Sequence, residues 1–139
     1  MDFAAFNYYM ISEEDGIVVN KVDDIVLGYE IKCKYPTYRG AYLCNVLKIQ
    51  LFVDGKEIPE ENLRFDVNGK SFLMEEITDQ YKEYWFTGAK AALRVIDENG
   101  IAPGEHKVKM LMHHKIPYTG YFGTYLELDG TCEKTLTVK

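Results

Sequence analysis

The sequence predicts an all-β fold: an antiparallel β-sandwich of immunoglobulin-like architecture with at most one short helix. The first observation is a period-two alternation of apolar and polar residues in segment after segment, the pattern of strands with one buried face. The second is a turn signal about every 8 to 12 residues, built from Asn, Asp, Gly and Pro. Short strands at this spacing are typical of two antiparallel sheets packed face to face.

The alternating segments give the expected strands in chain order. Asp54-Gly55 and Asn68-Gly69 interrupt them as two-residue turns, a strong signal for tightly paired strands. Only residues 71–84 have a pattern that fits a helix, and a short one. The segments expected to form strands are 26–35, 45–58, 63–74, 91–96, the stretch that begins at residue 107, and 132–139.

Length and charge limit the possible functions. With 139 residues, the chain is expected to form a single β-sandwich domain over residues 1–139. The net charge of −6 comes from acidic residues scattered among the lysines, and no two Lys or Arg residues are adjacent. We therefore expect neither nucleic acid nor a membrane as a partner.

The first residues and the cysteines indicate the cytoplasm. Asp2 and the absence of a basic residue before a short apolar stretch do not fit a signal peptide. Cys33, Cys44 and Cys132 are odd in number, include no CxxC pair and lie inside or beside apolar runs. We expect buried free thiols of a reducing compartment rather than a disulfide or a redox centre.

Two adjacent histidines, His113 and His114, suggest a metal site. Neighbouring side chains on a strand point to opposite faces, so the two cannot share a metal ion unless the strand breaks between them. His106 has the parity of His114, but about eight residues place them roughly 26 Å apart along a strand. We expect no metal site in this strand. His114 is in step with Met112, so it is either a hydrogen-bonded residue at the end of the core face or a ligand or general base.

No nucleophile or acid pair stands out. The chain has no GxSxG motif, and Glu75 and Glu76 fit a solvated helix face better than a glycosidase dyad. Trp85 is expected between the two sheets. The segments "YPTYRGAYLCNV" and "IPYTGYFGTY" combine Pro, Gly and Tyr, the composition of ordered loops. Their tyrosines and the arginine fit a protein–protein interface, with closure of the open ends of the sandwich as the alternative.

Several of these segments occur in an order that resembles a known protein family. "YPTYRGAYL" is followed by "VDGKEIPEENLRFDVNGKSFLMEEI", by "YWFTGAKAALRV" and by "IAPGEHKVKM". From about Val22 to its last residue the chain resembles the beta subunit of bacterial C-glycoside deglycosidases. The most specific elements are Tyr38-Arg39-Gly40, the spacing between the two hairpin turns, and the pair Trp85-Phe86.

The resemblance implies a non-catalytic but required small subunit of a carbon–carbon lyase complex, beside a larger TIM-barrel alpha subunit. In that family the alpha subunit carries the histidine base and the divalent metal, expected to be manganese, so no cofactor is expected on this chain. The implied substrate is a 3-keto C-glycoside with an aromatic, flavonoid-type aglycone. The base removes the C2 proton, the metal stabilises the enolate, and elimination expels the aglycone from C1.

On this hypothesis the chain supplies an interface and has no catalytic or metal-binding residue of its own. Arg39 is expected to pair with a carboxylate or a backbone carbonyl of the partner, and His114 is a candidate for lining the pocket. The alternative is a free-standing carbohydrate-binding module that stacks sugars on exposed aromatic rings. The histidine spacing disfavours an autonomous metal hydrolase. The expected partner-interface residues are Tyr38, Arg39, Gly40, Tyr118, Tyr121 and Phe122.

Overall fold

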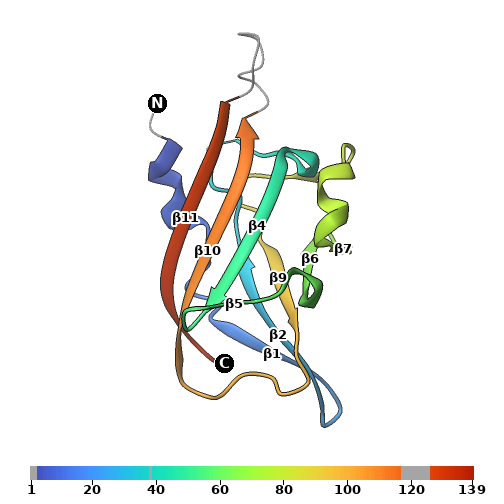
Figure 1. The fold of residues 1–139 in the computed structure, drawn as a ribbon, viewed down its shortest axis with the longest axis vertical. Helices are drawn as coiled ribbons and strands as arrows, with labels where there is room; N and C mark the ends of the chain where they lie inside the picture. The colour runs from blue at the N-terminus through green and yellow to red at the C-terminus, as the bar shows by residue number, and fades with distance from the viewer. Residues whose placement is uncertain (1–2, 38, 117–125) are drawn as a thin grey trace.

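Two antiparallel sheets pack face to face in the computed structural model, which describes residues 3–37, 39–116 and 126–139 (Figure 1). One sheet has five strands in the order β1-β2-β9-β6-β7, and the other has four in the order β11-β10-β4-β5. The all-β sandwich predicted from the sequence is confirmed. The five-stranded sheet contains β1 (Ile17–Val22), β2 (Ile25–Cys33), β9 (Ala91–Ile96), β6 (Leu63–Val67) and β7 (Lys70–Leu73).

The four-stranded sheet is built around one long hairpin. β10 pairs with β11 in unbroken register from Glu105↔Thr137 to Ile116↔Leu126, and its other edge pairs with β4. A separate two-stranded ribbon, β3 with β8, closes one end of the sandwich. These elements are β11 (Leu126–Thr137), β10 (Glu105–Ile116), β4 (Val46–Val53), β5 (Lys56–Glu57), β3 (Ala41–Tyr42) and β8 (Tyr84–Trp85).

The two hairpin turns predicted from the sequence are confirmed. Asp54 and Gly55 join β4 to β5 with φ angles of 52° and 83°, and Asn68 and Gly69 join β6 to β7 with 53° and 78°. Two successive positive φ angles define the type I′ turn, whose twist matches that of the flanking strands.

The helical content differs from the expectation of at most one short helix. The described residues contain four 3₁₀ segments: η1 (Phe3–Tyr9), η2 (Leu43–Asn45), η3 (Glu60–Asn62) and η4 (Met74–Asp79). Only η4 lies in the segment where a helix was expected. The others are single turns or a short aromatic stretch, and such segments have too few residues to show a helical period. None of the helices in the described ranges is long and apolar enough to cross a membrane.

The core lies between the sheets, and Trp85 is one of its largest fully buried side chains. Its side chain is 1% exposed, and its ring contacts Tyr35 and Phe65 with centroid separations of 5.2 Å each. Its indole N–H donates to the Ala89 carbonyl at 3.0 Å, so the buried polar atom is satisfied. The core position predicted for Trp85 is therefore confirmed. In β10 every second residue from Val108 to Ile116 is buried, as the alternation requires.

Candidate functional site

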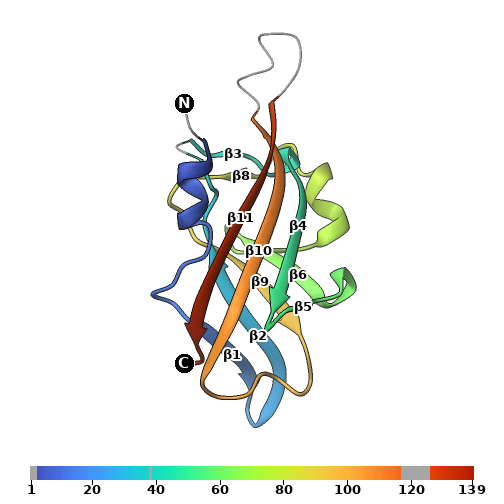
Figure 2. The ribbon, with the colours of Figure 1, turned by 60° about the vertical axis from the view of Figure 1, so that its left-hand side comes forward.

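One end of the sandwich carries the segment that the sequence assigned to a partner interface. The β2–β3 connection, residues 34–40, lies at the end where β10 finishes and where the β3–β8 ribbon and η1 are found (Figure 2). In it, Arg39 is exposed and Gly40 is half-buried. The other expected interface residues, Tyr38, Tyr118, Tyr121 and Phe122, lie outside the described residues and stay predictions.

Hydrogen bonds fix the backbone on both sides of Arg39. The Thr37 amide donates to the Tyr35 carbonyl at 3.0 Å, and the Thr37 hydroxyl donates to the Arg39 carbonyl while accepting from the Arg39 amide. From the turn after β8, the Thr87 hydroxyl donates to the Thr37 carbonyl at 3.1 Å. The described residues on the two sides of position 38 are therefore held by hydrogen bonds, as the Pro, Gly and Tyr content of the segment indicates.

Gly40 is required by a close backbone approach. A Cβ atom at this position would lie 2.3 Å from the Trp85 carbonyl oxygen and 2.9 Å from the Thr87 amide nitrogen. No side chain fits there unless β8 shifts, so glycine lets the β2–β3 connection lie directly on the ribbon.

The ribbon presents aromatic side chains to solvent beside this connection. Tyr42 is 48% exposed and Phe86 is 61% exposed. The Tyr84 ring lies between them, with centroid separations of 5.0 Å to Tyr42 and 4.8 Å to Phe86, each edge to face. The sequence analysis used Phe86 only as part of a motif. The alternation of Tyr84 and Phe86 around buried Trp85 is the signal that could have identified this aromatic face.

His114 lies directly beneath the same end. It is 1% exposed, and its Nδ1 is 3.2 Å from the Tyr35 hydroxyl, which is buried with it. Burial, with a smaller contribution from the nearby His113, lowers the pKa of His114 to about 4. The neutral ring is thus a hydrogen-bonded part of the core face, the first of its two expected positions. Whether it lines a pocket stays a prediction.

Comparison with known proteins identifies the family. Residues 6–118 match the family described as C-glycoside deglycosidase beta subunit. The chain belongs to this family. Proteins of the same name from Eubacterium cellulosolvens and Microbacterium trichothecenolyticum are 33% and 32% identical to it over 84 and 88 residues, or 60% and 63% of the chain. The chain spans less than two thirds of these two relatives, 57% and 66% of their length. One from Arthrobacter globiformis is 32% identical over 112 residues, covering 78% of this chain and 82% of that protein.

The beta subunit family match includes most of the elements at the end described above. It spans the β2–β3 connection, the aromatic ribbon and β10 with His114. The name of the family describes its members as beta subunits, parts of a larger enzyme.

Other groups that the sequence singled out have local structural partners. His113 is partly exposed, with Nδ1 at 2.6 Å from Asp129 and Nε2 at 3.4 Å from Glu127, and these carboxylates raise its pKa. The His113 and His114 side chains lie on opposite faces of β10, because His113 is partly exposed and His114 is buried. Over residues 3–37, 39–116 and 126–139 there is no group of three or more His, Cys, Asp or Glu side chains placed to hold a metal ion.

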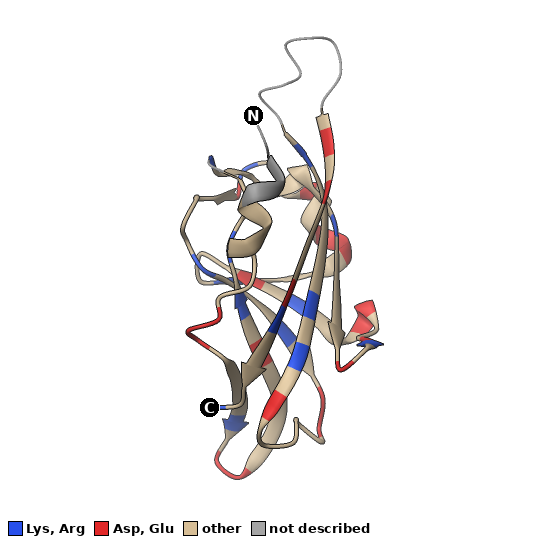
Figure 3. Cartoon of the chain, turned by 90° about the vertical axis from the view of Figure 1, so that its left-hand side faces the viewer, with Lys and Arg blue, Asp and Glu red and all other residues tan. Residues whose placement is uncertain are grey.

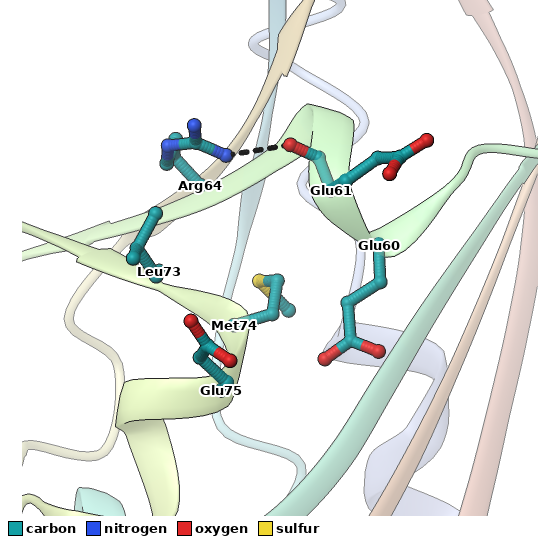
Figure 4. A pocket seen from close by; sticks show the side chains of 6 residues that line it. All are labelled: Glu60, Glu61, Arg64, Leu73, Met74 and Glu75. Atoms are coloured by element: carbon teal, nitrogen blue, oxygen red, sulfur yellow. Dashed lines mark hydrogen bonds between the residues drawn. The ribbon is translucent and has the colours of Figure 1, made fainter.

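Of the acidic pair Glu75 and Glu76, only Glu75 lines a cleft of about 520 Å³ (Figure 4). Glu76 accepts the Leu73 amide at 2.7 Å and so caps η4. Glu75 faces the cleft beside Glu60 and Glu61. The backbone carbonyl of Glu61 accepts a hydrogen bond from the Arg64 guanidinium at 2.9 Å. One carboxylate of the pair is thus structural, which does not fit a glycosidase dyad.

The three cysteines are free thiols, as expected. Cys33 and Cys132 are buried, whereas Cys44 is half-buried. Burial raises the pKa of Cys33 to about 12, so this thiol is unreactive at neutral pH. Lys and Arg residues are interspersed with acidic and neutral ones along the strands (Figure 3), and the chain therefore offers no basic stripe for nucleic acid in this view.

Proposed function

We propose that this chain is the non-catalytic but required small subunit of a heteromeric C-glycoside deglycosidase in the cytoplasm. Its partner is a TIM-barrel alpha subunit that holds a divalent metal, manganese, and the general base. The complex cleaves the carbon–carbon bond between an aromatic, flavonoid-type aglycone and a 3-keto sugar. The family match over residues 6–118 is the observation that carries the proposal.

The structure supports an interface at the Arg39 end. An exposed arginine stands on a backbone that several hydrogen bonds hold in place, and exposed aromatic rings lie beside it. Arginine and aromatic residues are enriched where interfaces gain most of their free energy. Aromatic rings offer a large contact area at a small cost in conformational entropy, and arginine donates several hydrogen bonds from a planar group.

A small subunit at that end can assist the elimination without supplying a reacting group. Removal of the C2 proton creates an enolate, which a metal stabilises best in a site from which water is excluded. Covering the mouth of the barrel excludes water and holds the substrate in one orientation. These roles require a surface that keeps its shape, and the hydrogen bonds of Thr37 with Arg39 and Thr87 support such a role for the described part of the β2–β3 connection.

The test is Arg39→Ala in the full chain, mixed with the alpha subunit. We expect the dissociation constant of the two subunits to rise about 30-fold or more, because truncating a hot-spot arginine costs about 2 kcal/mol or more. Thermal unfolding of the isolated variant should match that of the wild type, since Arg39 is exposed. Surface plasmon resonance and native mass spectrometry measure the assembly.

Arg64→Ala is the matched control. Arg64 is half-buried and lies in β6, outside the β2–β3 connection. The variant should therefore bind the alpha subunit as the wild type does. Equal affinity of Arg39→Ala and wild type would contradict the interface.

The exposed Tyr42 and Phe86 rings keep one alternative open, a free-standing carbohydrate-binding module. Calorimetric titration of the isolated chain with simple glycans separates the two functions. Saturable glycan binding, together with failure to bind an alpha subunit, would favour the module.

A further inference from the structure

A groove of about 380 Å³ lies beside the β2–β3 connection. Its walls come from η1, from the start of the connection and from the turn after β8. Three aromatic residues, Phe6, Tyr9 and Tyr35, line it together with Lys34, Thr37 and Thr87. This volume is at the lower end of the range for small-molecule sites, about 300 to 1,000 Å³.

The groove is held in shape by the core. Tyr35 is 3% exposed, and its ring contacts both Trp85 and His114 at centroid separations of 5.2 Å. The hydrogen bond from the Thr87 hydroxyl to the Thr37 carbonyl joins the two sides. A pre-formed site binds its ligand without first having to order its walls.

The polar groups of the groove are few and of defined character. Within the described residues, the Lys34 ammonium has no hydrogen-bond or ion-pair partner. The Thr37 and Thr87 hydroxyl protons are already donated to backbone carbonyls, so Thr87 can only accept a further hydrogen bond. The groove therefore offers aromatic faces, the Lys34 ammonium as a cationic donor, the Thr87 hydroxyl as an acceptor, and the Tyr9 hydroxyl, which can donate or accept.

This set of groups complements a phenol rather than a sugar. A phenolic ring presents a flat π-face, an O–H that Thr87 can accept, and oxygens that attract a cation. A sugar presents hydroxyls in every direction and needs several paired donors and acceptors, which the groove lacks.

We propose that this groove binds a phenolic ring of the aglycone, with Lys34 donating a hydrogen bond to a phenolic oxygen. The inference rests on the proposed function, because that function supplies an aromatic substrate at this end. Thr37 is bonded to Arg39, so the ring would lie at the edge of the proposed subunit interface, with the sugar held by the alpha subunit.

The first experiment uses the full chain alone and phloroglucinol (1,3,5-trihydroxybenzene) as the probe. We expect saturable shifts of the backbone amide resonances of Lys34, Thr37 and Thr87 in ¹H–¹⁵N NMR spectra. Tyr9→Ala should weaken binding about 3- to 10-fold, the usual effect of losing one aromatic contact. Tyr81→Ala is the matched control, because Tyr81 is likewise an exposed tyrosine, lies outside η1 and does not line the groove.

The second experiment uses the assembled complex and a 3-keto aryl C-glucoside. Tyr9→Ala and Lys34→Gln should raise KM about 3- to 10-fold with kcat unchanged, because the contact is equally strong in the ground state and the transition state. Tyr81→Ala should leave both constants unchanged.

Two results would overturn the proposal. One is the absence of saturable phloroglucinol shifts at the three amides up to the solubility limit. The other is weakened subunit assembly in Tyr9→Ala with KM unchanged, which would mean that a side chain of the alpha subunit fills the groove. The titration needs no partner, so its outcome is independent of whether the chain assembles with an alpha subunit.

Discussion

At the scale of single residues, His114 makes the stability of the fold depend on pH. Its folded pKa of about 4 lies below the usual value of 6.5, because burial disfavours the charged ring. Between these two values the unfolded chain binds a proton that the folded chain does not. This residue therefore lowers the free energy of unfolding as the pH falls from 6.5 towards 4.

We predict that between pH 6.5 and pH 5 the free energy of unfolding falls by about 2 kcal/mol more in the wild type than in His114→Gln. The expected limiting slope is about 1.4 kcal/mol per pH unit for one proton. Urea unfolding of both proteins across this range measures the difference in slope, which does not depend on how stable the variant is at neutral pH. Parallel curves for the two proteins would show that His114 is not held neutral.

The other two histidines act with the opposite sign and are present in both proteins. His106 Nδ1 lies 2.6 Å from Asp54, and its Nε2 lies 2.7 Å from the Ala102 carbonyl. Both partners accept, so the ring is protonated to donate twice, and these bonds raise its pKa. Its stabilising effect is present at low pH and is lost as the pH rises through the raised value.

The buried position of His114 could be predicted from the sequence, but its hydrogen-bond partner could not. The parity of His114 with Met112 predicted its position on the core face, because alternation on a strand is a local property. The Tyr35 hydroxyl that bonds it is 79 residues away. A hydrogen bond between segments so distant depends on how the sheets pack, which no local pattern encodes.

At the scale of elements, the ribbon of β3 and β8 depends on Gly40. We predict that Gly40→Ala lowers the free energy of unfolding by about 2 kcal/mol, because the added methyl group forces the β8 backbone to move. Differential scanning calorimetry measures the loss.

Gly69→Asn is the control for this substitution. Gly69 has a φ of 78° with no atom within 4 Å of an added Cβ, and asparagine tolerates this backbone conformation. The control should lose less than about 1 kcal/mol. A Gly40→Ala variant as stable as the control would mean that the ribbon is free to shift.

The elements also differ in how well the sequence predicted them. The hairpins at Asp54-Gly55 and Asn68-Gly69 were predicted because their turn type has strict residue requirements. The ribbon was not, because β3 and β8 have two residues each and show no period. η1 was missed for a similar reason: its sequence, FAAFNYY, has no polar face to reveal a helix.

At the scale of the whole molecule, the sandwich and the family were both accessible from the sequence. Period-two alternation predicted the two sheets, and the order of the segments around Tyr38-Arg39-Gly40 carried the family resemblance. The groove beside η1 was not accessible, because Phe6, Tyr35 and Thr87 come from three distant segments. Only the packing of η1 against the sandwich brings them together.

Because β10 is paired on both of its edges, the exchange rates of its amide protons report the stability of the whole folded subunit, and so its binding to a partner. From Val108 to His114 its residues are paired to both β4 and β11, so their amide protons exchange with solvent only when the sheet opens as a whole. We predict that these amides exchange more slowly than those at the free edge of β1, as hydrogen–deuterium exchange read by NMR can show. A partner that binds the folded chain should slow them by the factor 1 + [L]/Kd, so one strand far from most of the surface would report the affinity of the whole subunit.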